Sequence, residues 1–122
     1  MAGTSSLAAS SLGAVLDRGL VRAVLQPIVD IDSGAVVAYE ALARGPAGTP
    51  LERPDVLFAA ARRSGRVAEL DWLCRAAAIR AALDAGIRPP TALFVNIEPE
   101  ALGTVAPAHL TPLLEQAERE LA

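Results

Sequence analysis

Apolar residues near the start of the chain recur at the spacing of one helix face. They are Leu12, Val15, Leu16 and Leu20. This interval of three to four residues predicts a short helix within residues 11–23, and Gly19 is expected to end it. The residues before it, 1–13, are rich in serine, alanine and glycine and are expected to form a frayed leader.

A different pattern follows, in which two runs rich in β-branched residues, 24–31 and 35–42, flank Asp-Ser-Gly at 32–34. Such a turn between two apolar runs predicts a β-hairpin, with the glycine at the position that tolerates positive φ. Pro27 lies inside the first run and has no N–H for a ladder. We therefore expect this strand at a sheet edge or a bulge.

Glycine and proline residues divide the rest of the chain into helices and one strand. Pro54 is expected to open a helix that ends at about residue 64, and a longer helix is predicted over 67–85. Its predicted apolar stripe consists of Leu70, Leu73, Cys74, Ala77 and Ala81. A short strand over 91–98 and a last helix over 109–121 complete the prediction. Strands that alternate with helices after a hairpin favour an α/β sheet or barrel.

Glu40 and Arg44 interrupt an otherwise apolar run. In a helix they would form a surface pair at i and i+4 that contributes a few tenths of a kcal/mol. In a strand, Glu40, Leu42 and Arg44 would point to the same face. Periodicity leaves both alternatives open, and the turn at 32–34 favours the strand. A charge on a core-facing strand costs several kcal/mol unless it is paired or binds metal, so the strand alternative indicates a functional role.

Asn96 raises the same question in the strand over 91–98, where it shares a face with Phe94. A buried asparagine either ties down a neighbouring loop or offers its oxygen to a ligand. In α/β folds, ligands bind at the carboxyl ends of strands, and both Glu40 and Asn96 fall near such ends. Two oxygen donors on neighbouring strands suit a hard cation such as Mg²⁺.

Composition narrows the class of protein. The 122 residues are about one domain's worth, and 52% hydrophobic residues argue against global disorder. No membrane segment or signal peptide is expected, because no apolar run is long enough and the start lacks a basic region. The single cysteine, Cys74, is interpreted as a small apolar helix residue and fits a reducing, cytoplasmic location. A net charge of −3 argues against binding to DNA or RNA.

Three segments resemble, in order and spacing, the motifs of the EAL domain family. They are Gln-Pro-Ile-Val-Asp at 26–30, Tyr-Glu-Ala-Leu-Ala-Arg at 39–44 and Phe-Val-Asn-Ile at 94–97. The segment Glu-Leu-Asp-Trp at 69–72 also resembles the family at that place. We expect residues 1–22 to be a leader and short helix, and 23–122 to be the N-terminal half of an EAL-type domain.

The resemblance implies a modified (β/α) TIM-like barrel, of which this chain would form the first half only. It also implies the family's activity, hydrolysis of cyclic di-GMP to the linear dinucleotide with Mg²⁺ or Mn²⁺. It implies Glu40 and Asn96 as metal ligands, Arg44 as a phosphate contact, and Leu42 and Gln26 as residues that line the substrate site. The family's later motifs, with further carboxylates and a lysine, have no counterpart in this sequence. No catalytic residue is identifiable, and the chain alone is expected to be inactive.

Three hypotheses remain open at this point, and with them the question of whether the chain is part of an enzyme. The first is the N-terminal half of a cyclic di-GMP phosphodiesterase, and the second is a non-catalytic module that binds cyclic di-GMP or a protein. The third is an unrelated small α/β interaction domain. An incomplete barrel would expose a strand edge, which predicts self-association.

Overall fold

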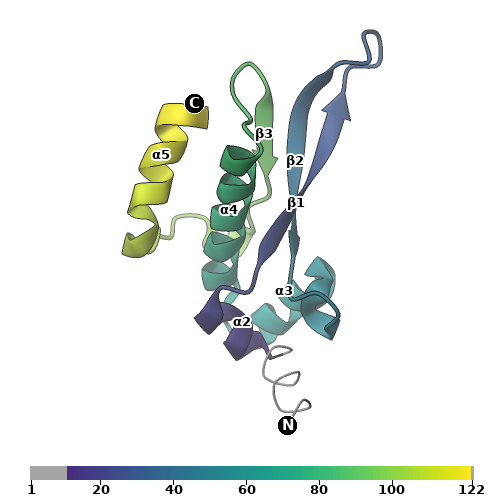
Figure 1. Ribbon diagram of the computed structural model, residues 1–122. Coiled ribbons are helices and arrows are strands. Elements are labelled where there is room, and N and C mark those ends of the chain that lie inside the picture. The colour runs from purple at the N-terminus through teal and green to yellow at the C-terminus, as the bar shows by residue number, and fades with distance from the viewer. Residues whose placement is uncertain (1–10, 122) are drawn as a thin grey trace.

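The computed structural model describes residues 11–121, and its elements follow the predicted order (Figure 1). The helices are α2 (Leu12–Arg18), α3 (Pro54–Arg63), α4 (Val67–Asp84) and α5 (Thr111–Leu121). The strands are β1 (Arg22–Val29), β2 (Val36–Arg44) and β3 (Ala92–Val95). Short 3-10 turns lie at η1 (Pro50–Glu52), η2 (Pro99–Ala101) and η3 (Ala108–Leu110). Most of the predicted leader, residues 1–10, lies outside the described residues.

The three strands form one mixed sheet in the order β1-β2-β3. β1 and β2 are antiparallel and form the predicted hairpin, which projects beyond the helices in Figure 1. β1 lies at the edge of the described sheet, as Pro27 predicts, and its register shifts between Ile28 and Val29. β2 and β3 are parallel, from Ala38 opposite Ala92 to Ala41 opposite Val95. The mixed α/β class is therefore confirmed.

The tip of the hairpin shows why this sequence turns where it does. Gly34 has a φ of 72°, which a residue with a side chain rarely adopts. Asp30 accepts the N–H groups of Asp32 and Ser33 on its carboxylate, at 2.8 and 3.0 Å. These hydrogen bonds lower the pKa of the Asp30 carboxyl, because they favour its charged form.

Within residues 11–121, α4 covers one face of the sheet. α4 packs along β1 and β2, where Ala41 is 6% exposed. The core cluster lies where α2, α3 and α4 meet and contains Val15, Leu16, Leu51, Leu57, Ala61, Val67 and Leu70. The other face, which we call the open face, carries Val24, Gln26, Ile28, Glu40, Leu42 and Phe94, by strand register. Phe94 is 56% exposed there, so the open face is partly apolar and accessible.

The burial of α4 is broader than its predicted apolar stripe. Leu70 and Ala77 are buried as expected, whereas Leu73, Cys74 and Ala81 are only partly buried. The other buried residues of α4 are Val67, Asp71, Ala76, Ala78 and Ala82. α4 contacts other helices, the sheet and η2, so burial extends around more of its circumference than one stripe. Within residues 11–121, no helix is both long and apolar enough to cross a membrane.

Gly45, directly after β2, lies against the backbone of η1. Its N–H donates to the Glu52 carbonyl oxygen at 3.1 Å. A Cβ at this position would overlap the carbonyl oxygen of Leu51 and lie 2.8 Å from its carbonyl carbon. Only glycine allows this approach without movement of the backbone.

We therefore expect Gly45→Ala to lower the free energy of unfolding by about 1–3 kcal/mol, the usual cost of an inserted methyl group that forces backbone shifts. Urea unfolding followed by circular dichroism measures the loss. Gly13→Ala is the control for an added methyl group, because a Cβ at Gly13 meets nothing within 4 Å. Since Gly13 lies in α2, where alanine is the better helix former, this variant should not lower the free energy of unfolding. Equal midpoints for the two variants would contradict the close approach at Gly45.

Candidate functional site

Gln26 and Glu40, two of the predicted site residues, lie directly opposite each other on the open face. They are Cα partners across β1 and β2, and Glu40 is in turn beside Phe94 across β2 and β3. A row of Gln26, Glu40 and Phe94 therefore crosses the three strands. Because β2 extends through Arg44, the helical alternative with a Glu40–Arg44 surface pair is excluded.

The environment of Glu40 is unusual for a carboxylate. The residue is partly buried, and within residues 11–121 its side chain has no hydrogen-bond or ion-pair partner. Of the residues beside it in the row, one is a neutral amide and the other is aromatic. Partial burial without a compensating charge is costly, which makes this carboxylate available to a cation.

The other three predicted residues, Leu42, Arg44 and Asn96, line one pocket at the carboxyl ends of β2 and β3. The pocket has a volume of about 380 Å³. Its apolar wall comes from Ala41, Ala43, Val95, Phe58 and Ala78, and charged side chains from Arg62 and Glu98 also reach it. Glu40 and Gln26 do not line it. Gln26 and Glu40 thus lie in a row on the open face, and Arg44 and Asn96 lie at the pocket. Leu42 shares the open face by register and also lines the pocket.

The predicted strand over 91–98 is shorter in the structure and ends at Val95. Asn96 is the first residue beyond the ladder, whose last pair is Ala41 with Val95. Since Glu40 is level with Phe94, Asn96 lies two residues, or about 7 Å, further along the strand direction. The approach of the Glu40 and Asn96 side chains to one cation stays a prediction.

The described residues supply only part of a metal site. No group of three or more His, Cys, Asp or Glu residues that could hold a metal occurs within 11–121. Glu40 offers a carboxylate without a partner and Asn96 an amide oxygen, and both are ligand types that Mg²⁺ and Mn²⁺ accept. Their chemistry fits such an ion, but two donors do not complete its coordination shell.

Asp71 is a further residue of interest; the sequence analysis noted its segment, 69–72, as family-like but assigned Asp71 no role. It lies on α4, is 1% exposed and accepts the Glu98 N–H on its Oδ1 at 2.8 Å. Its Oδ2 accepts Arg75 Nε at 2.5 Å. Two sequence signals could have indicated it: the resemblance of residues 69–72 to the family, and a charged residue beside Leu70 in an apolar helix. Asp71 connects α4 to the segment that follows Asn96.

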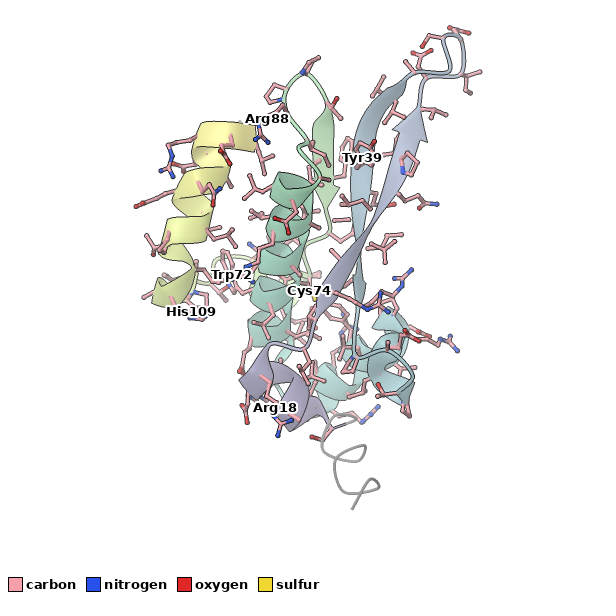
Figure 2. All side chains as sticks on the ribbon, viewed as in Figure 1. Arg18, Tyr39, Trp72, Cys74, Arg88 and His109 are labelled. Atoms are coloured by element: carbon pink, nitrogen blue, oxygen red, sulfur yellow. The ribbon has the colours of Figure 1, made fainter. Side chains whose placement is uncertain are left out.

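Cys74 and Trp72 leave α4 on different sides, as Figure 2 shows. Cys74 lines the pocket, and Trp72 Nε1 donates to Thr104 Oγ1 at 3.0 Å. Burial raises the pKa of the Cys74 thiol to about 12, and the nearby charges of Asp71 and Glu98 raise it further in the same direction. A thiol that stays protonated is a poor nucleophile, which supports the interpretation of Cys74 as a small apolar residue.

These observations define an α/β domain with a three-stranded mixed sheet, one covered face, and polar residues grouped near the carboxyl ends of parallel strands. The chain belongs to the EAL domain family, whose model matches residues 9–121. This membership confirms the predicted resemblance and excludes the hypothesis of an unrelated interaction domain.

Among solved structures, this chain is similar to that of a standalone versatile EAL protein from Vibrio cholerae O395 in its c-di-GMP-bound form. It is 28% identical to this chain, with a TM-score of 0.55. The similarity covers 81% of this chain and 39% of that one, so this chain spans less than half of that protein's length. No curated protein matches the chain.

Proposed function

We propose that this chain forms the first half of a cyclic di-GMP phosphodiesterase domain and contributes part of its metal and substrate site. The observation that carries the proposal is the carboxylate of Glu40, partly buried on the open face without a partner among the described residues. It begins the Glu-Ala-Leu triplet of β2, one strand away from Asn96. Family membership and the c-di-GMP-bound neighbour support the ligand class.

In this proposal the open face lines the interior of a (β/α) barrel that further strands would complete. β3 has a free edge in the described sheet, and Val24 and Phe94 are exposed on the open face. Additional parallel strands joined to that edge would satisfy its backbone groups and cover the apolar side chains. The metal site would then receive its missing carboxylates from those strands.

Each predicted residue has a distinct role in the proposed site. Glu40 and Asn96 would hold Mg²⁺ or Mn²⁺, an ion that when bound polarises a phosphodiester and lowers the pKa of a water. Arg44 presents a planar guanidinium that matches phosphate oxygens, and its Nη1 donates to the Ala43 carbonyl at 2.8 Å. Leu42 and Gln26 would contact the rest of the dinucleotide.

A second candidate function is recognition of cyclic di-GMP without hydrolysis. It is supported by Arg44 and Leu42 at one pocket, a set of contacts to a ligand that needs no metal ion. Arg44 and the adjacent pocket would still offer contacts to a phosphate and an apolar ring face. Turnover by a domain in which this chain is joined to the carboxyl-terminal half of an EAL domain separates the two candidates.

The role of Arg44 is testable in that joined domain. Arg44→Ala should raise the KM or Kd for cyclic di-GMP by about 10-fold or more, because a charge-assisted contact to phosphate is lost. Calorimetry and product chromatography measure the two constants. Arg80→Ala is the control, because Arg80 is exposed on α4, away from β2. It should leave both the KM and the Kd unchanged. An Arg44→Ala domain with the affinity of the control would remove Arg44 from the substrate site.

A further inference from the structure

We infer that Asp71 is a positioning residue for Asn96, because it anchors the backbone of the segment that carries this side chain. The metal role of Asn96 rests on the proposed function. The anchoring itself rests only on contacts among the described residues.

The segment after β3 has few constraints of its own. Sheet pairing ends at Val95, and residues 96–98 have no regular secondary structure. The next backbone group held by the rest of the chain is the Glu98 N–H, which donates to Asp71 Oδ1 at 2.8 Å. Asn96 therefore lies between two fixed points, the end of the ladder and the Glu98 amide, with only Ile97 between it and the second point.

Asp71 is the only charged residue among the buried residues of the described chain. Its burial is compensated by two hydrogen bonds, one from Arg75 on its own helix and one from the Glu98 amide. The pair with Arg75 is not bidentate: Arg75 Nη2 is buried without a partner among the described residues, while its guanidinium stacks 4.0 Å from the Trp72 ring. Asp71 thus gives one oxygen to its helix and the other to the segment after Asn96.

Other contacts hold the same loop at greater distance from Asn96. Arg62 of α3 pairs with the carboxylates of Glu98 and Glu100, at 2.6 and 3.0 Å. Arg62 is about half exposed, so solvent screens these pairs, and they hold side chains rather than the backbone. The buried contact to the Glu98 N–H is the one that restricts the backbone next to Asn96.

One pair of variants distinguishes the effect of the hydrogen bond between Asp71 and the Glu98 N–H from that of the Asp71–Arg75 ion pair. Asp71→Leu and Arg75→Met both break the Asp71–Arg75 pair, but only Asp71→Leu removes the acceptor of the Glu98 N–H. In this chain, we expect Asp71→Leu to speed hydrogen exchange of the Glu98 amide by about 10-fold or more relative to Arg75→Met, the equivalent of one lost hydrogen bond. The backbone of Asn96 should also show lower heteronuclear NOE values. Equal exchange in the two variants would overturn the inference.

A second pair leaves the interior of α4 intact and covers the case in which Asp71→Leu does not fold. Glu98 has a φ of −73°, which proline adopts, so Glu98→Pro deletes the N–H donor at little conformational cost. Glu98→Ala is its control, because it removes the same carboxylate and keeps the N–H. Greater mobility of Asn96 in Glu98→Pro than in Glu98→Ala supports the anchor, and equal mobility contradicts it.

The effect of Asp71 on the metal site is measured in the joined domain, as the Mn²⁺ concentration that turnover requires. Compared with Arg75→Met, Asp71→Leu should raise the Mn²⁺ concentration for half-maximal turnover by about 10-fold, while kcat at saturating Mn²⁺ changes less. An unchanged Mn²⁺ requirement would show that the anchor does not act through Asn96. If the unsubstituted joined domain shows no turnover, the proposed function fails, and the exchange and mobility measurements still decide whether Asp71 holds the segment.

Discussion

In the joined domain, Glu40→Gln is expected to reduce hydrolysis of cyclic di-GMP by at least about 100-fold. The substitution keeps the size and shape of the side chain and removes only its charge. A neutral amide oxygen is a weaker ligand for a hard cation, and even residues that merely support metal ligands cost 10- to 100-fold when changed, so a ligand itself should cost at least as much. Chromatography of the linear product under saturating Mg²⁺ or Mn²⁺ gives the rate.

The same variant should not be less stable than the original chain. Glu40 is partly buried without an ion-pair partner in the described residues, so its charge stabilises nothing that glutamine would lose. Glu69→Gln is the matched control, since Glu69 is exposed on α4 and pairs with Arg66 at 2.8 Å. It should retain full activity. Full activity in Glu40→Gln would refute its assignment as a required ligand.

Much of the fold could be predicted because local chemistry and the final structure agree. Gly19 and Gly65 follow predicted helices and have φ values of 63° and 67°, so each helix ends where its glycine allows the left-handed conformation. The hairpin followed from β-branched residues, a glycine turn and Pro27. All of these signals act over a few residues, which is the range that a single sequence reports well.

The strand over 91–98 was predicted too long because its end is set by a distant partner. Apolar residues continue to Ile97, yet β2 offers no Cα partner beyond Ala41. The chain then leaves the sheet, and the Glu98 N–H donates to Asp71, 27 residues earlier in the sequence. A pattern of alternating residues contains no information about such a contact.

The sequence predicted which kinds of residues form the site better than it predicted how they are arranged in space. Register confirms that Glu40 belongs to a strand, and the pocket brings Leu42, Arg44 and Asn96 together. Asp71 was given no role, although its segment resembles the family, because a single aspartate on a helix ordinarily faces solvent. Its burial depends on two partners, Arg75 and the Glu98 amide, and the second comes from another part of the chain.

The polypeptide of residues 1–122, purified by itself, is expected to hydrolyse cyclic di-GMP at no measurable rate. The described residues offer one carboxylate and one amide oxygen to a metal, whereas a two-metal centre needs several carboxylates to hold both ions and to activate a water. Arg44 can still attract a phosphate, but without both metal ions the activated water that would attack it is missing.

The open face should make this isolated polypeptide self-associate, because it exposes Val24 of β1 at 40% and Phe94 of β3 at 56%, and the outer edge of β3 is free in the described sheet. The measurement is incubation with Mg²⁺ or Mn²⁺ and cyclic di-GMP, chromatography of the linear product, and size-exclusion chromatography of the same samples. Metal-dependent turnover that increases with chain concentration and disappears in Glu40→Gln would contradict the prediction. In that event, copies of this chain would complete one another's metal site, and the carboxylates now assigned to further strands would have to come from a second Glu40.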